Sequence, residues 1–356
     1  NSATTILDAY GLARWSNGQW TTVGRGVRNP GSLTITDLAV IGNDLYVGGS
    51  FNQVYNTDGS ILTVDCIARW NTVSNTWAFM GAANGAGNNG VPGDVLALAV
   101  NGTDLYVGGT FLKAHNSSSN QIPANHLAKW NGTTWSVIGS ASDLSNNGVN
   151  GTVSEIYFNN NTLYVAGDFS SALNNGTVVN ANRIARWTGS SWATLGNGNG
   201  LDGNGVNDEV LTILSVNNNL YVGGSFTEAY NNAGSMVSLT SLGRWTGTAW
   251  SPLGTGIAEG VMALVTDSDA VYAGGGFASA GTCSTADGCS RIARYTPLPA
   301  LASTKLVTPQ IDVALSRPSN AQLGGLLYAQ PAEVTDGVAY DLVIVGSGPA
   351  GLGAAV

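Results

Sequence analysis

Leu105-Tyr-Val-Gly-Gly-Thr-Phe111 is the stretch that decides the fold, because the chain repeats nearly the same seven residues five times. The other copies are Leu45–Phe51, Leu163–Phe169, Leu220–Phe226 and Val271–Phe277. Their tyrosines are separated by steps of 60, 58, 57 and 51 residues. A near-constant period of this size indicates a repeat architecture, in which each repeat is one small structural unit.

A second motif completes each unit. It consists of an apolar residue, a small residue, a basic residue and Trp, and a second Trp follows after a short turn. All ten tryptophans belong to five such pairs: Trp15 and Trp20, Trp70 and Trp77, Trp130 and Trp135, Trp187 and Trp192, Trp245 and Trp250. A sixth, reduced copy is Ile292–Tyr295. Turn formers such as Asn131-Gly132 between the tryptophans predict a β-hairpin with a cross-strand Trp pair.

The rest of the unit is also β in character. An apolar stretch such as Val95–Val100 precedes each glycine-rich motif, and no helical periodicity is present. Paired glycines such as Gly108-Gly109 suit positions where two sheets approach closely. Four short antiparallel strands repeated at this spacing predict the blades of an all-β protein, a β-propeller.

The number of blades is open between five and six. Complete units span about 36–81, 95–139, 153–196 and 208–254, and a fifth unit from about 259 lacks its closing Trp strand. Five blades result if the N-terminal hairpin Leu12–Gly24 completes the last unit. Six blades need two further strands from the tail, around Ile311–Ser316 and Leu326–Ala329.

Over residues 10–297 the repeats resemble the kelch-like and galactose-oxidase-like propeller repeats of secreted and cell-surface proteins. The resemblance implies a β-propeller over 1–297. The residues after it read as a linker or edge strands over 298–338, followed by a strand and glycine-rich tail over 339–356. Propellers of this kind include binding modules, enzymes and structural parts, so the resemblance does not select a function.

Composition excludes several functions. Only 10% of the residues are charged and the net charge is −9, so nucleic acid and anionic membrane surfaces are poor candidate partners. No apolar run is long enough for a membrane span. Two histidines, no nucleophile elbow and no Cys-x-x-Cys give hydrolase and thiol-redox chemistry little support. Carboxylate pairs for glycoside hydrolysis stay open.

The three cysteines suggest an oxidising compartment. Cys283 and Cys289 flank a turn-forming span and are expected to form a disulfide, whereas Cys66 is expected to be a buried free thiol. A metal site at the cysteine pair is disfavoured because neither His115 nor His126 lies near it in sequence. The chain starts without Met, which fits a mature product that has lost a signal peptide, or a trimmed chain. We therefore expect an extracellular or cell-surface location.

One loop resembles a calcium loop. Asp202, Asn204 and Asp208 bring oxygen side chains close together, as a weak Ca²⁺ site would require. The related loops of other units lose the acids, so a solvated turn is the simpler interpretation.

The repeated basic and aromatic residues each have two interpretations. One basic residue precedes the first aromatic of every pair: Arg14, Arg69, Lys129, Arg186, Arg244 and Arg294. These side chains either contact a ligand once per blade or pack on neighbouring rings and carboxylates, and periodic placement favours packing. The tryptophans are either sugar-stacking platforms of a lectin or contacts between blades, and contacts are the commoner role.

The tail carries a different motif. The apolar stretch Asp341–Val345 leads into Gly346, Gly348 and Gly351, spaced as Gly-x-Gly-x-x-Gly. The combination resembles the opening of FAD-dependent oxidoreductases, including the glucose-methanol-choline type, and implies that these glycines bind the pyrophosphate. The ribose-binding acid expected about 20 residues later has no counterpart before Val356, so this chain alone is expected not to bind FAD. The alternative is that the tail is an apolar packing strand. Such a strand could complete a sheet of its own chain or of a neighbouring subunit.

These observations favour a non-catalytic binding or structural assembly module that self-assembles through its C-terminal strand into a homo-oligomer or filament. Its partners would be other protein subunits or surface glycans. The alternatives are an accessory propeller of an FAD-dependent oxidoreductase and a carbohydrate-binding lectin.

Overall fold

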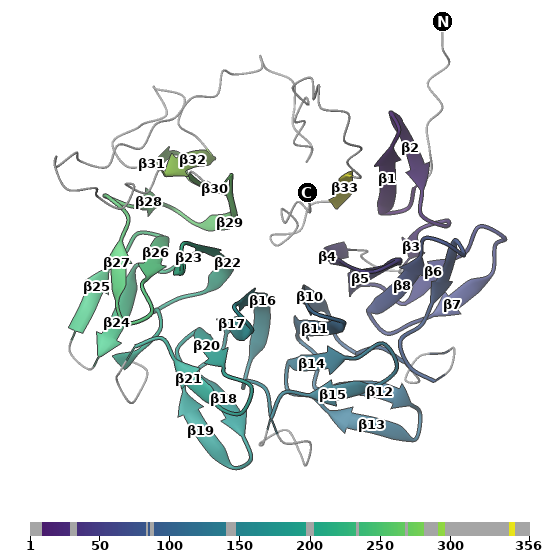
Figure 1. Cartoon of the computed structure of the whole chain (residues 1–356), viewed down its shortest axis with the longest axis horizontal. Coiled ribbons are helices and arrows are strands. Elements are labelled where there is room, and N and C mark those ends of the chain that lie inside the picture. The colour runs from purple at the N-terminus through teal and green to yellow at the C-terminus, as the bar shows by residue number, and fades with distance from the viewer. Residues whose placement is uncertain are drawn as a thin grey trace, which may run out of the picture. The chain divides into compact units, whose positions relative to one another are not determined.

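The protein was analysed as a computed structural model, which describes residues 9–28, 34–82, 85, 89–139, 147–196, 203–232, 235–267, 270–280 and 291–295 and the backbone of 342–345. Every regular element among these residues is a β-strand, so the predicted all-β class is confirmed (Figure 1). No helix in the described residues is long and apolar enough to cross a membrane. The chain divides into two compact units, described separately below.

The first unit contains two four-stranded antiparallel sheets and a three-stranded terminal sheet. The first four-stranded sheet consists of β4 (Thr34–Ile41), β5 (Asp44–Ser50), β8 (Ile67–Asn71) and β9 (Thr76–Ala78). The second consists of β10 (Val95–Asn101), β11 (Asp104–Gly109), β14 (Leu127–Trp130) and β15 (Trp135–Val137). The terminal sheet has the order β2 (Gln19–Thr22), β1 (Leu12–Ser16) and β33 (Leu342–Val345).

The second unit repeats the same pattern. Its sheets are β16 (Thr152–Asn159), β17 (Thr162–Asp168), β20 (Ile184–Trp187) and β21 (Trp192–Thr194); β22 (Val210–Val216), β23 (Asn219–Gly224), β26 (Leu242–Trp245) and β27 (Trp250–Pro252); and β29 (Val261–Thr266), β30 (Val271–Gly275) and β32 (Ile292–Tyr295). The predicted strand order within a repeat is confirmed, and it is the meander of a propeller blade.

Neighbouring sheets within a unit pack through their first strands, β4 on β10, β16 on β22 and β22 on β29. The paired glycines allow this approach. A Cβ on Gly48 would lie 2.5 Å from the Val95 side chain of the next sheet, and a Cβ on Gly223 would lie 2.5 Å from that of Val261. The predicted close approach of sheets at the glycine pairs is therefore confirmed.

Sequence reasoning missed one hairpin per repeat. Between their second and third strands three repeats insert a two-stranded hairpin: β12 (Lys113–Ser117) with β13 (Asn120–Pro123), β18 (Ser171–Asn174) with β19 (Thr177–Asn180), and β24 (Glu228–Asn232) with β25 (Ser235–Ser238). In the first repeat the hairpin is β6 (Gln53–Tyr55) and β7 (Ile61–Thr63), and β3 (Val27–Arg28) pairs with β6. In the last repeat β31 (Ser279–Ala280) pairs with β28 (Ile257–Ala258). Asn175-Gly176 between apolar residues was a readable hairpin signal in one of them.

The N-terminal hairpin and the fifth repeat are each described within their own compact unit. Strands β1 and β2 form a sheet with β33, while β32 ends its own sheet with no further strand among the described residues. The further strands expected near 311–316 and 326–329 lie outside the described residues, and the number of blades stays a prediction.

Candidate functional site

The terminal sheet joins the two ends of the chain. Strand β33 pairs antiparallel with β1, with Leu12 opposite Val345, Ala13 opposite Ile344 and Trp15 opposite Leu342. Figure 1 shows β33 lying beside β1, and β2 pairs with the other edge of β1. In the other repeats this position next to the basic-residue strand belongs to the glycine-rich strand. The predicted tail strand therefore forms, and it acts here as a sheet partner.

The hairpin β1–β2 that receives β33 is specified locally. Asn17 and Gly18 form its two-residue turn with φ of 50° and 74°, the left-handed pair that favours a tight hairpin. Trp15 lies directly opposite Trp20, and their ring centroids are 5.2 Å apart. Trp20 is nevertheless 41% exposed, whereas the other closing tryptophans, Trp77, Trp135, Trp192 and Trp250, are 3–5% exposed.

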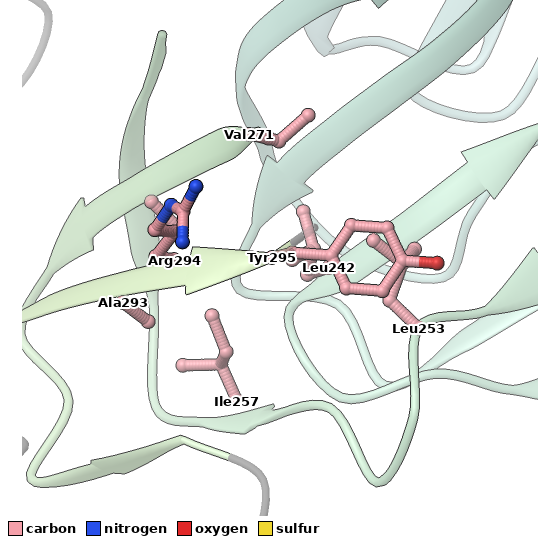
Figure 2. A pocket seen from close by; sticks show the side chains of 8 residues that line it. Leu242, Leu253, Ile257, Val271, Ala293, Arg294 and Tyr295 are labelled. Carbon is pink, nitrogen blue, oxygen red and sulfur yellow. The ribbon is translucent and has the colours of Figure 1, made fainter. Parts of the chain in front are cut away.

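A second unfinished edge lies at β32. A shallow apolar hollow opens beside this strand, lined by Leu242, Leu253, Ile257, Val271, Ala273, Ala293, Arg294 and Tyr295. Figure 2 shows the Tyr295 ring projecting over this hollow, with Leu253 and Ile257 below it. In the complete sheets the corresponding space is covered by a fourth strand with its Trp.

Three of the six repeated basic residues contact a neighbouring strand of their own sheet, as their periodicity predicted. Arg69 lies 3.1 Å from the Asp44 carboxylate, and Lys129 lies 2.9 Å from that of Asp104. Arg294 lies over the Tyr272 ring at 5.9 Å. These pairs bind strand to strand within a sheet, so the residues are engaged in packing and not presented as a ligand ring.

The tyrosines of the glycine-rich motif pack beneath these basic residues. Burial raises the pKa of Tyr46, Tyr106 and Tyr221 above its usual value. Tyr221 also contacts Tyr295 of the next sheet, with ring centroids 6.2 Å apart. Neutral phenols at these places suit contacts between sheets.

The tryptophans are mostly inaccessible. Trp70, Trp130 and Trp245 are 3–6% exposed, and the paired indoles lie 5.2–5.4 Å apart in tilted or edge contacts. A sugar face needs an exposed ring for stacking. The sugar-platform interpretation is therefore wrong for these buried rings. A carbohydrate ligand stays a prediction, and Trp20 is an exposed ring available for stacking on it.

A repeated asparagine, not identified from the sequence, holds each closing strand. Asn56, Asn116 and Asn231 accept hydrogen bonds from the backbone N–H of the closing Trp at 2.7, 2.6 and 2.6 Å. Each follows the Phe of the glycine-rich motif by five residues, which was a readable signal. Asn174 holds the same place but donates instead to the Ser190 carbonyl.

The loop of the calcium hypothesis serves the fold where it is described. The buried Asn204 amide accepts from the Asn182 backbone N–H at 3.0 Å and donates to the Asn180 carbonyl at 3.0 Å. Asp208 accepts from the Glu209 backbone N–H. Asp202 lies outside the described residues, in which no cluster of His, Cys, Asp and Glu could hold a metal ion. The Ca²⁺ site stays a prediction.

The cysteine predictions are partly open. Cys283 and Cys289 lie outside the described residues, so their disulfide stays a prediction. Cys66 is free, as predicted, but it is half-buried and not fully buried. Burial raises the pKa of its thiol, which disfavours the reactive thiolate.

His115 and Asp65 form a buried pair that the sequence did not suggest. His115 Nδ1 lies 3.0 Å from an Asp65 carboxylate oxygen, and the histidine is 2% exposed. The pair therefore links the β12 strand to the loop before β8.

Gly346, Gly348 and Gly351 lie outside the described residues. The strand before them fits the dinucleotide-binding motif, but its neighbour β1 is antiparallel and belongs to the Trp-paired hairpin. A dinucleotide site needs parallel strands joined through a helix. The described surroundings of this strand therefore do not fit FAD.

No known family model matches the chain, and no curated protein matches it. Among solved structures it is similar to the extracellular domain of a hybrid two-component system from B. thetaiotaomicron, with 12% identity, a TM-score of 0.46, and coverage of 85% of this chain and 30% of that one. The WD40 β-propeller domain of Doa1 has 11% identity, a TM-score of 0.37, and coverage of 70% and 64%. The computationally designed Ika8 protein has 14% identity, a TM-score of 0.39, and coverage of 96% and 89%.

The chain thus spans about a third of the length of the first of these proteins. TM-scores and identities this low assign neither a function nor a location. The propeller class rests on the sheets of this chain itself.

Proposed function

We propose that the chain is a non-catalytic assembly module of the cell exterior, a propeller-type protein whose C-terminal strand completes the N-terminal sheet in its own or in a second copy. The observation that carries the proposal is the antiparallel pairing of β33 with β1. The resemblance of the repeats to kelch-like propeller repeats of secreted and cell-surface proteins supports the extracellular part of it.

Strand exchange follows from this arrangement. The backbone hydrogen bonds between β33 and β1 are the same whether the two strands belong to one copy or to two, so concentration selects between them. Without β33, β1 exposes a row of backbone donors and acceptors, which is the usual template for strand addition. The same pairing would therefore close a monomer at low concentration and link copies at high concentration.

A disulfide experiment tests the proposal. One population carries Ala13→Cys and another carries Ile344→Cys, two positions that face each other across β1 and β33. After mixing and oxidation we expect a 13–344 linked dimer, identified by peptide mass spectrometry, whose yield rises with concentration. Ala13→Cys mixed with Leu342→Cys is the out-of-register control, since Leu342 faces Trp15. Equal yields from the two mixtures would refute the proposal.

A flavoenzyme origin is the second candidate, favoured by one observation. Leu342–Val345 is a strand and directly precedes Gly346, as the dinucleotide-binding motif requires. In that case the propeller is an accessory domain of an oxidoreductase acting on alcohols or sugars. A flavin absorbance band in the protein isolated from its natural source would support this function, and its absence would count against it.

A further inference from the structure

The last sheet of the second unit, β29–β30–β32, has an exposed apolar face. We call the face of a sheet that packs on the preceding sheet of its unit the leading face, and the opposite face the trailing face. The trailing face of this last sheet carries Val265, Tyr272, Gly274 and Ile292. In other sheets the residue equivalent to Ile292 is buried against the next sheet, with Ile67 and Ile184 0% exposed and Leu242 3% exposed. Ile292 itself is 37% exposed.

Two further residues of this trailing face show the same contrast. Val265 is 52% exposed, whereas Leu214, at the equivalent position of the preceding sheet, packs against the buried cluster of the next sheet. A Cβ on Gly274 would have its nearest neighbour at 3.8 Å, whereas a Cβ on the equivalent Gly223 would lie 2.5 Å from the Val261 side chain. The face therefore has the composition of a buried trailing face and the exposure of an uncovered one.

The terminal sheet of the first unit is exposed on the opposite face. Its trailing face is covered, because Leu12 is 1% exposed and shares a buried cluster with Trp70 and Trp77 of the next sheet. Its leading face carries Trp15 and Trp20, which face each other across the hairpin. Trp20 is 41% exposed, whereas the other closing tryptophans are 3–5% exposed. The described sheets thus include one exposed trailing face and one exposed leading face.

Two contacts recur where a trailing face meets a leading face. The tyrosine of the glycine-rich motif meets the first aromatic residue of the next sheet, as Tyr221 meets Tyr295 with ring centroids 6.2 Å apart. The closing Trp of the next sheet shares a buried cluster with the apolar residue that begins the basic-residue strand, as Trp135 does with Ile67. A further buried cluster holds both kinds of pair, Tyr164 with Trp245 and Ile184 with Trp250. Faces of this kind therefore fit one another through two aromatic contacts.

We propose that the trailing face of the last sheet binds the leading face of the terminal sheet of a second copy of this chain. Trp15 of the second copy lies against Tyr272, and Trp20 of the second copy covers Ile292. The two sheets meet face to face, so the pairing of β1 with β2 and β33 stays intact and no strand edge is used. The contact joins two different surfaces and therefore propagates head to tail. It deepens the assembly function proposed above and rests on it.

Sedimentation velocity over a range of concentrations tests the contact. We expect concentration-dependent association that Trp20→Ala weakens at least about 30-fold, the effect typical of a buried interface aromatic. Ile292→Asp should weaken it at least as much, because an unpaired carboxylate would be buried between the faces, whereas Ile292→Val should preserve it. Val178→Asp is the matched control, since Val178 is also an exposed apolar residue of the second unit but lies on β19. This control should leave association unchanged.

Mixing the two deficient variants gives the decisive arm. The Trp20→Ala chain keeps its trailing face and the Ile292→Asp chain keeps its leading face, so the mixture should form heterodimers that grow no further. Circular dichroism checks that each variant is folded.

A third variant separates this contact from strand exchange. Ile344→Pro blocks exchange of β33, so association that remains in this variant and is lost when Ile292→Asp is added belongs to the face contact. Association that is lost in Ile344→Pro but unaffected by Ile292→Asp belongs to strand exchange and would overturn the proposal. A wild-type chain that stays monomeric would also overturn it.

Discussion

Gly148→Ala tests how the turn at residues 147–149 is held within the second compact unit. Gly148 belongs to an Asn-Gly-Val turn, has φ of 62°, and a Cβ there would lie 2.0 Å from the Asn125 carbonyl oxygen. The turn also carries three backbone hydrogen bonds of 2.9, 2.9 and 3.1 Å, from Gly148 to Ile138, Leu173 to Gly148, and Val149 to Asn125. The clash is with backbone, so the turn has to move.

The expected cost has two parts. Alanine at a left-handed position costs about 1–2 kcal/mol, and each hydrogen bond lost adds about 1 kcal/mol. We therefore expect Gly148→Ala to destabilise the turn by about 3–5 kcal/mol. Gly189→Ala is the matched control, because Gly189 has φ of 95° and nothing lies within 4 Å of its added Cβ. This control should cost only the conformational part, about 1–2 kcal/mol.

Hydrogen exchange at single amides measures the difference locally, which matters because a repeat protein can unfold in stages. A gap of about 2 kcal/mol corresponds to a roughly 30-fold greater loss of protection at the Val149 and Leu173 amides in Gly148→Ala than in Gly189→Ala. Equal losses in the two variants would refute the reasoning that close backbone packing and these hydrogen bonds hold the turn in place.

Two further predictions concern buried polar groups. Asn116→Ala removes both hydrogen bonds to the Trp135 backbone and should lower the free energy of unfolding in urea by about 2–4 kcal/mol. Asn116→Asp keeps the acceptor and should lower it less. The reverse order would contradict the role of Asn116 in holding the closing strand. Burial raises the pKa of Asp37 to about 7, although the backbone N–H groups of Leu98 and Leu38 oppose the rise. Since this carboxyl has a higher pKa folded than unfolded, stability should fall as the pH rises from about 4 to 7 and then level off. Asp37→Asn should flatten that part of the profile, and an unchanged slope would contradict the assignment.

Much of the blade could be predicted from the sequence because it is encoded locally. The Trp pairs sit around tight turns, and the directly facing Trp130 and Trp135 confirm the predicted hairpins. The glycine pairs predicted close approach, which Gly48 and Val95 confirm. The basic residues were predicted to pack, as Arg69 and Asp44 show. Each of these features recurs at the near-constant period of the repeat, which made a chance pattern a poor explanation.

Features that depend on distant partners were harder to predict. The pairing of β33 with β1 joins opposite ends of the chain, and no local pattern specifies it. The residue before each basic-residue strand is left-handed, with φ of 59° at Cys66 and Ser241 and 65° at Arg183, although none of these is Gly or Asn. Their backbone groups are held by hydrogen bonds to the preceding Phe and glycine strand, so tertiary contacts override local preference.

Amide hydrogen exchange of β1 tests the central claim most directly, because the proposed function depends on β33 occupying the edge of this strand. The comparison is between the wild-type chain and Ile344→Pro, with Ile344→Val as the conservative control. The account predicts that amides of Leu12–Ser16 facing β33 are protected in the wild type and in Ile344→Val and lose that protection in Ile344→Pro, while the four-stranded sheets stay unchanged. Equal protection of these amides in all three proteins would contradict it.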